Sequence, residues 1–277
     1  IVEFGEIAVT GTFVADKATP VGGTASADNE GVMVLKGATK LQGDATQGGT
    51  IKASQIVVGE GVTVSTEQGK HGRIIATGDT GSQFTKAKLV TTGTMDVTGK
   101  STFNESDLLF TGGSADVPAT LTFVDNAPTF IAAGNTRNTI SVGDSNGAES
   151  VAKLTAAETE DWSLADVKVN VYQTQSAFTV KSKNGRVTLG DMLVHGTLAV
   201  DQATTGTSSA NEGTLVLDGT ATLKGNQTSG GVLTAKDIVA EQGAKVTVGT
   251  GEYGHLIASG TSAMNLTNLQ TDDLKGT

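Results

Sequence analysis

Residues 29–62 read NEGVMVLKGATKLQGDATQGGTIKASQIVVGEGV, and residues 211–244 read NEGTLVLDGTATLKGNQTSGGVLTAKDIVAEQGA. The two stretches share all their glycines except Gly59, and most apolar positions, so that Gly31 aligns with Gly213 and Leu41 with Leu223. A protein of 277 residues therefore carries the same irregular pattern twice. Duplication of a structural unit is the simplest explanation, and the pattern within the unit predicts the fold.

The similarity between the two copies begins before the quoted stretches and continues beyond them before it fades. We place the internal duplication at residues 4–89 and 189–269, with an irregular middle at residues 126–175. The sequence opens with IVEFGEIAV, which has no initial Met and already shows a strand pattern. We therefore expect residues 1–277 to form one elongated β-solenoid that is a fragment of a longer protein.

A shorter period, marked by Gly-x-apolar-x-apolar, occurs inside each copy. The marker glycines are Gly11, Gly31, Gly49, Gly72 and Gly93, then Gly196, Gly213, Gly231 and Gly254. They are spaced 20, 18, 23 and 21 residues apart in the first copy and 17, 18 and 23 in the second. Periods near 20 residues predict a solenoid, in which each turn buries its apolar side by stacking on its neighbours.

Within one turn the apolar residues alternate with polar ones, as in a β-strand. Ile51 and Ala53 would point inward, whereas Thr50 and Lys52 would point outward. Glycines separate three such strands per turn. The fold we predict is all-β: a right-handed parallel β-helix (β-solenoid) with rungs of about 20 residues.

Antiparallel β-sandwiches are the alternative, because they also contain many short strands. Their hairpin turns favour Asn-Gly and Asp-Gly. Asn-Gly occurs only at Asn146 and Asn184, outside the repeated regions, and the Asp-Gly at Asp218 has Lys36 in the other copy. The scarcity of hairpin signals favours the solenoid.

Composition excludes several classes of function. A net charge of -10, with 19 basic against 29 acidic residues, disfavours nucleic-acid binding, which needs a basic surface. No apolar run approaches the roughly 20 residues of a membrane-spanning helix. The sequence has no Cys, so we expect neither disulfides nor thiolate metal sites.

The turns GVMVLKGATKLQG (residues 31–43) and GTLVLDGTATLKG (residues 213–225) resemble those of Gram-negative autotransporter passenger domains and related secreted β-helix adhesins. The resemblance implies export through both membranes, display at the cell surface, and adhesion or self-aggregation. Some members of that family are proteases with a Gly-Asp-Ser-Gly motif. The nearest string in this sequence is GDSNG at Gly143.

Residues that often form metal or catalytic sites do not occur in suitable patterns. His71, His195 and His255 align with Tyr253, Thr10 and Arg73 of the other copy, and none has a partner at ligand spacing. Asp144, Asn146 and Glu149 lack the spacing of a calcium loop, so a turn is the preferred interpretation. The neighbouring acids Asp144, Glu158, Glu160, Asp161 and Asp166 do not repeat at the turn period, apart from Asp144 and Asp166. We expect no enzyme activity, cofactor or metal.

The irregular middle contains AAETEDWSLADVKVNVYQ from Ala156, with the only Trp of the sequence. Irregular segments of repeat proteins tend to project and to carry binding sites. A helical turn with Thr155 as its cap would present Glu158, Glu160, Asp161 and Trp162 as a binding site. The alternative is that Trp162 seals the junction between two stacks of turns.

We therefore expect an extracellular bacterial cell-surface adhesin. It would bind itself, or a host-surface protein or glycan, through a rigid polar face, and would meet a membrane only through an anchor domain outside this sequence. A surface-layer, matrix or stalk protein is the first alternative. A tailspike-like enzyme that cleaves polysaccharides is the second.

Overall fold

The structure is a computed structural model that describes residues 1–17, 31–134, 136–203, 212–260, 264–267 and 270–271. All helix or strand structure in these residues is β-strand, and the ladders between named strands run parallel. The protein forms two compact units, residues 1–108 with 120–138 and residues 109–119 with 139–277. Asn29 and Asn211, where the two quoted stretches begin, and Leu269, the expected end of the second copy, lie outside the described residues.

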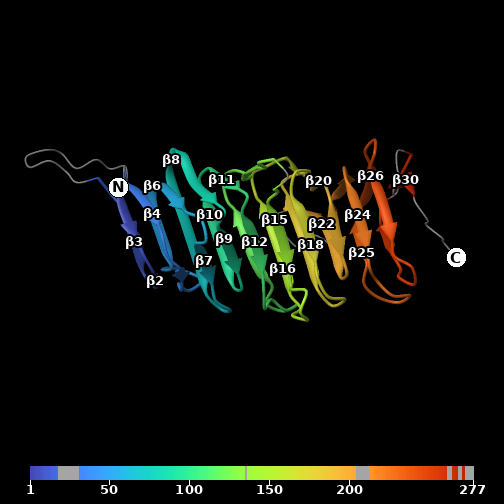
Figure 1. The fold of residues 1–277 in the computed structure, drawn as a ribbon, viewed down its shortest axis with the longest axis horizontal. Coiled ribbons are helices and arrows are strands. Elements are labelled where there is room, and N and C mark those ends of the chain that lie inside the picture. Colours follow the sequence, from blue (N-terminus) through green and yellow to red (C-terminus); the bar gives the residue numbers. More distant parts are fainter. Residues whose placement is uncertain (18–30, 135, 204–211, 261–263, 268–269, 272–277) are drawn as a thin grey trace, which may run out of the picture. The chain divides into compact units, whose positions relative to one another are not determined.

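The first unit is a coil of short strands in which successive turns pair side by side, as β4, β6, β8 and β10 do in Figure 1. Its strands are β1 (Val2–Phe4), β2 (Ile7–Val9), β3 (Thr12–Val14), β4 (Val32–Leu35), β5 (Thr39–Leu41), β6 (Thr50–Val58), β7 (Thr63–Thr66), β8 (His71–Thr85), β9 (Lys88–Thr91), β10 (Thr94–Thr98), β11 (Ser101–Asn104), β13 (Ala119–Phe123) and β14 (Thr129–Ile131). The backbone passes from one unit to the other within β12 (Asp107–Phe110).

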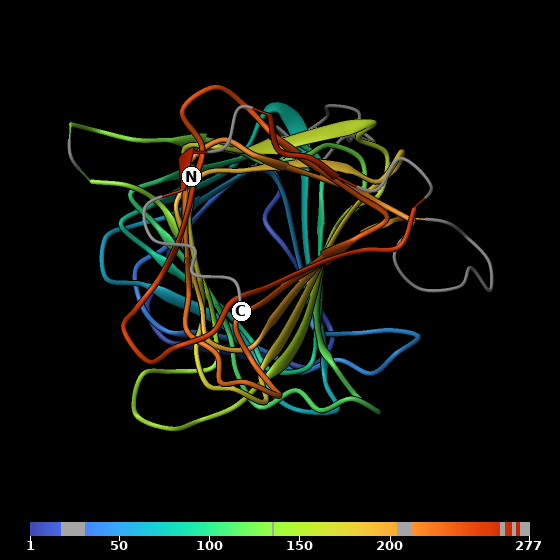
Figure 2. The same ribbon diagram turned by 90° about the vertical axis from the view of Figure 1, so that its right-hand side faces the viewer.

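The strands of the first unit form three sides. The first side contains β3, β10, β13 and the N-terminal parts of β6 and β8. The second contains β1, β4, β11, β14 and the C-terminal parts of β6 and β8. The third contains β2, β5, β7 and β9. In Figure 2 the strands of the first unit, coloured blue to green, form the walls, with loops at the corners.

The second unit has the same three-sided construction. Its first side is β16 (Val151–Ala156), β19 (Ala177–Ser182), β22 (Thr197–Gln202), β25 (Val232–Ala235) and β28 (His255–Ala258); its second is β17 (Asp161–Leu164), β20 (Arg186–Leu189), β23 (Thr214–Leu217), β26 (Asp237–Ala240) and β29 (Met264–Asn265); its third is β15 (Thr139–Val142), β18 (Lys168–Val171), β21 (Met192–Val194), β24 (Thr220–Leu223), β27 (Lys245–Val248) and β30 (Gln270–Thr271). The predicted all-β parallel β-helix is confirmed.

Residues that pair across a strand ladder measure the length of a turn. Ile51 pairs with Ile74 and Ile74 with Val97, which gives 74 − 51 = 23 and 97 − 74 = 23 residues. The marker Gly31 precedes β4 on the second side, whereas Gly49 precedes β6 on the first. The spacing of 18 between these glycines therefore covers only part of a turn.

Within each of the two sequence copies, neighbouring strands pair in the same register. Phe4 of β1 lies opposite Leu35 of β4, and the aligned Leu189 of β20 lies opposite Leu217 of β23. The aligned pairs β2–β5 and β21–β24, β5–β7 and β24–β27, and β6–β8 and β25–β28 also agree residue by residue. Both copies therefore build the same turns from different side chains.

Inward-facing side chains stack from turn to turn and form the core. Ile51, Ile74 and Val97 lie in one row, and all three are fully buried. Complete burial of such a side chain is worth about 1.5–3 kcal/mol, so a row of them gives strong cohesion between turns. Phe84, at the second side, stacks on Phe103 with the ring centroids 4.4 Å apart.

Trp162 lies inside the core of the second unit. The backbone turns after Ala156 and enters β17, where Asp161 and Ser163 face outward while Trp162 and Leu164 face inward. The predicted helical turn is therefore wrong. Asp-Trp-Ser-Leu alternates at the period of a strand, and the stacking of Trp162 beside Val187 of β20 outweighs the local helical signal.

Candidate functional site

An exposed loop joins the third and first sides of the first unit, and an equivalent loop occupies the same place in the second. We call residues 43–49 the first corner loop and residues 225–231 the second. In the first loop, Asp44 Oδ1 accepts the N–H groups of Thr46 at 2.8 Å and Gln47 at 2.7 Å, and also the Thr46 hydroxyl at 2.8 Å. This arrangement is typical of an Asx turn, which fixes a loop through its own backbone.

These hydrogen bonds also favour the ionised form of the Asp44 carboxylate. They hold the pKa of Asp44 below its usual value, with the Gln47 N–H contributing most, followed by the Thr46 hydroxyl and N–H, and then the positive charge of Arg73. Asp44 is exposed, so its carboxylate faces solvent while it orders the loop. The loop tip therefore carries a fixed negative charge.

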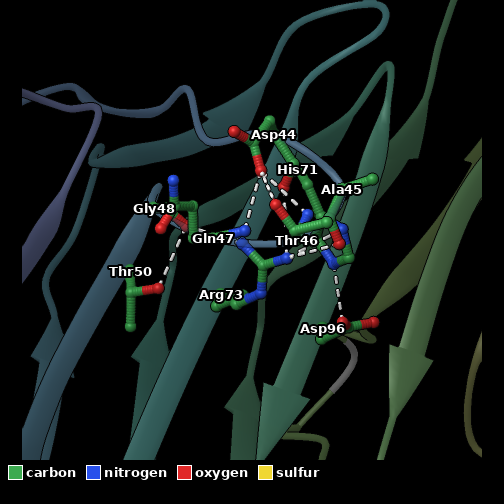
Figure 3. Close-up of polar contacts among 9 residues, drawn as sticks. All are labelled: Asp44, Ala45, Thr46, Gln47, Gly48, Thr50, His71, Arg73 and Asp96. Atoms are coloured by element: carbon green, nitrogen blue, oxygen red, sulfur yellow. Dashed lines mark hydrogen bonds and ion pairs between the residues drawn. The ribbon is translucent and has the colours of Figure 1, made fainter.

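Arg73 holds the first corner loop from the neighbouring strand β8. Its Nη1 donates to the carbonyl of Gly48 at 2.7 Å, and its Nη2 lies 3.1 Å from the carbonyls of Asp44 and Ala45 (Figure 3). Arg73 sits at an outward position of a strand, so it reaches the loop of the preceding turn. Its guanidinium thus binds three carbonyls of the loop, and the carbonyl of Gly48 also accepts the Thr50 hydroxyl at 3.0 Å.

His71 links Arg73 to the next turn. Arg73 Nη2 lies 3.2 Å from His71 Nδ1, and His71 Nε2 lies 2.6 Å from Asp96 Oδ2 on β10. A guanidinium can only donate, so Nδ1 must accept. A neutral His71 therefore carries its proton on Nε2 and donates it to Asp96. Both ring nitrogens are engaged in this arrangement, which positions the loop and offers no free base.

The second corner loop has the same type of turn, but a different side chain on the neighbouring strand holds it. Asn226 Oδ1 accepts the N–H groups of Thr228 and Ser229, both at 2.9 Å. His255 takes the position of Arg73, and its Nε2 donates to the carbonyl of Asn226 at 3.1 Å. Tyr253 replaces His71 and is exposed. The second loop therefore presents an aromatic ring and a neutral amide where the first presents an ion network.

We expect Arg73→Met to loosen the first corner loop. Losing the carbonyl contacts should lower the free energy of local opening by about 1–2 kcal/mol, so the amides of Thr46 and Gln47 should exchange about five- to thirtyfold faster. Hydrogen exchange followed by NMR measures this. The amides of Thr228 and Ser229 in the second loop are the internal control, and unchanged exchange at Thr46 and Gln47 would show that Arg73 does not hold the loop.

The four residues predicted as a binding site do not share one exposed surface. Glu158, Glu160 and Asp161 are exposed, but Trp162 is buried with 3% exposure and is not available to a partner. Trp162 packs between turns inside the core of the second unit, opposite Val187.

Basic side chains lie close to these acids. Glu158 forms an ion pair with Lys183 at 3.0 Å, and this hydrogen bond, with the charges of Glu158 and then Glu160, raises the pKa of Lys183. Asp161 lies opposite Arg186 in the strand ladder. The acids thus face positive charge from the next turn, so they do not form an uncompensated acidic surface.

The remaining candidates lie at turns and corners. Asp144 Oδ1 accepts the N–H groups of Asn146 at 2.8 Å and Ala148 at 3.0 Å, as the preferred interpretation of a turn requires. The pKa of His195 is lowered by burial and by the charge of Lys224, with Glu252 opposing. Glu149 and Asp166 are both exposed.

Asp201 contacts Gln202, Glu212 and Lys181, and the first copy also has an acid at the aligned position, Asp16. Asp201 Oδ1 accepts the N–H groups of Gln202 at 2.8 Å and Glu212 at 3.0 Å, and its Oδ2 lies 3.0 Å from Lys181 Nζ. Burial alone would raise the pKa of Asp201, but these donors together lower it. The carboxylate thus joins β22 to the residue that leads into β23.

The lowered pKa predicts a dependence of stability on acid. The folded pKa of Asp201 lies below the unfolded value of about 3.9, so the stabilisation is fully present above that value and is lost as pH falls through the folded pKa. Asp201→Asn should lower the free energy of unfolding by about 1–3 kcal/mol at neutral pH. The difference between variant and parent in urea melts should shrink below about pH 4; a constant difference would contradict the assignment.

The corner network was not predicted from the sequence. A weak signal existed, since GDATQGG and GNQTSGG occupy aligned positions and Arg73 aligns with His255. Nothing in the sequence linked Arg73 to residues 44–48, because the contact depends on the register between turns.

No protein-family model matches the sequence, and no curated protein or solved structure is recognisably similar to it. In the described part of the protein, no helix has the length and apolar character needed to cross a membrane. Within those same residues, no three His, Cys, Asp or Glu side chains gather in a way that would hold a metal ion.

Proposed function

We propose that this protein is a contact module of an exported bacterial cell-surface protein, and that it associates with copies of itself through the polar outer face of its second unit. The observation that carries the proposal is a set of mostly polar side chains that lie in register on the third side. We call it the third-side face. Its residues are Leu193, Thr220, Thr222, Lys245 and Thr247 on β21, β24 and β27.

The third-side face is held in place before any partner arrives. Thr247 Oγ1 donates to Thr222 Oγ1 at 3.2 Å, and the N–H of Thr220 donates to Asp191 Oδ1 at 3.0 Å. Threonine is stiff about χ1, and half-buried side chains have already lost much of their freedom. Binding through such a face costs little additional conformational entropy.

Charge decides how association should respond to salt. Two copies that each carry a net charge of -10 repel one another at low ionic strength. The third-side face itself contains one cation, Lys245, among hydroxyl and aliphatic groups. Salt should therefore strengthen self-association by screening the overall repulsion, since the Debye length falls to about 10 Å at 0.1 M.

We also propose that the module acts outside the cell. The parallel β-helix and its polar outer rows support the resemblance to autotransporter passengers and secreted adhesins, which would place the module outside the cell. A host-surface protein or glycan is the alternative partner. A stalk or surface-layer role is favoured by one observation, the identical register of the two sequence copies, which suits a repeating structural element.

Light scattering across a wide concentration range, at low and moderate salt, tests the proposal. We expect a mass that rises reversibly with concentration and rises further with salt. The double variant Thr222→Glu with Thr247→Glu should stay monomeric, because it adds two charges to the third-side face.

The matched control places the same two substitutions on another side of the same unit. Thr188 and Thr214 face outward on β20 and β23, so Thr188→Glu with Thr214→Glu changes the net charge equally. It should associate more than the third-side variant. Equal loss in both variants would indicate a general charge effect, and a parent that is monomeric under all conditions would favour a stalk or a host-ligand adhesin.

A further inference from the structure

We propose that Asn146 is a site of spontaneous covalent modification, at which the asparagine becomes an aspartyl or isoaspartyl residue with water as the only co-reactant. The sequence contains two Asn-Gly pairs, at Asn146 and Asn184. Gly has no Cβ to hinder approach to the preceding side chain, so both pairs have the required chemistry. The structure distinguishes them.

The reaction conserves atoms without an oxidant or reductant. The backbone nitrogen of Gly147 gives its proton to hydroxide and attacks Cγ of Asn146, and a new bond forms between these two atoms. The bond from Cγ to Nδ2 breaks and ammonia leaves with a proton from water, which gives a five-membered succinimide. Water then opens either ring carbonyl, and the products are aspartate or isoaspartate.

The loop around Asn146 leaves the attacking nitrogen available. Asp144 Oδ1 accepts the N–H groups of Asn146 and Ala148, but no hydrogen bond involves the Gly147 N–H or the Asn146 side chain in the described residues. Both residues are exposed, and no atom lies within 4 Å of where a Cβ of Gly147 would stand. The side chain and the nitrogen can therefore approach one another without displacing a neighbour.

Asn184 occupies the opposite environment. The N–H of Gly185 donates to the carbonyl of Ser182 at 3.1 Å, and Gly185 is buried. A Cβ on Gly185 would lie 3.0 Å from Cα of Gly213 on the next turn. Attack by this nitrogen requires that a hydrogen bond be broken and that packed backbone move.

The modification would alter its own loop. It adds one negative charge beside Asp144, and the isoaspartyl product inserts an extra backbone atom between Asn146 and Gly147. Asp144 also provides the carbonyl that accepts the Gln173 side chain at 2.6 Å. The product would therefore disturb a contact between two turns of the second unit.

Peptide mass spectrometry of the 277-residue protein, aged in mildly alkaline buffer, tests this inference. We expect the peptide containing Asn146 to gain the mass of replacing –NH2 by –OH, at least about fivefold faster than the peptide containing Asn184, since one hydrogen bond protects the latter. Enzymatic methylation of isoaspartate should follow the same order, and Asn146→Gln should abolish the first signal.

Ageing in denaturant is the control for sequence effects. Both sites should then react at similar rates, because the unfolded protein offers neither nitrogen a fixed partner. Equal rates in the folded protein, or faster reaction at Asn184, would overturn the proposal. So would a folded protein in which Asn146 stays intact while the denatured protein reacts.

Discussion

Replacing Phe103 by alanine is expected to lower the free energy of unfolding by about 3–5 kcal/mol. Phe103 is fully buried and contacts three other rings. It stacks on Phe84 at 4.4 Å with an angle of 7° between the planes, and its centroid lies 5.5 Å from Phe130 and 6.0 Å from Phe123. Alanine would leave a cavity that these rings, fixed on separate strands, cannot close.

Urea denaturation followed by circular dichroism measures this effect. Phe103→Leu is the control, because it keeps most of the apolar volume and should cost less than alanine. A loss below about 1 kcal/mol for Phe103→Ala would contradict the account, since it would imply that the aromatic row does not bind the turns together.

The second large effect is expected at Gly48, in the first corner loop. Gly48 has a φ of +79°, and a Cβ there would lie 2.0 Å from the carbonyl oxygen of Thr10. That oxygen also accepts the Gly49 N–H at 2.9 Å, so displacing it breaks a hydrogen bond between turns. We expect Gly48→Ala to destabilise the protein by about 3–5 kcal/mol through backbone strain and steric clash.

A substitution at Gly61 distinguishes backbone strain from steric clash. The Gly61 φ of +75° is nearly the same, but no atom lies within 4 Å of its Cβ position. Gly61→Ala should therefore cost only the strain of a left-handed residue, about 1–2 kcal/mol. Calorimetric melts of both variants give the comparison. Equal melting temperatures would mean that the close approach of Thr10 has no energetic weight.

The fold was accessible from the sequence because its determinants repeat. Alternation such as Ile51, Lys52 and Ala53 marks a strand that buries one face, and recurrence across turns marks stacking. The same alternation is present in residues 161–164, but there it competes with the capping and charge signals of a helical turn. The turn length was less accessible, because glycines at two different corners carry the same motif.

The candidate site was less accessible for a physical reason. Asp96 lies 25 residues after His71 and meets it only because β10 pairs with β8 in one particular register. Arg73 reaches the loop at Asp44 across the opposite ladder. A one-residue slip in either ladder would turn these side chains into the core. The sequence shows the turn residues of the loop but not the partner that fastens it.

The central claim is that, within each sequence copy, successive turns stack in parallel and with the same register. Disulfide trapping can test it. The sequence has no Cys, so each double variant contains only the introduced pair. We expect rapid cross-linking of Lys40→Cys with Ser65→Cys and of the aligned Thr222→Cys with Thr247→Cys, because neighbouring strands lie about 4.8 Å apart, within disulfide reach. The shifted pairs Lys40→Cys with Thr63→Cys and Thr222→Cys with Lys245→Cys should react poorly. Shifted pairs that cross-link as well as the registered ones, or registered pairs that fail in either copy, would contradict the account.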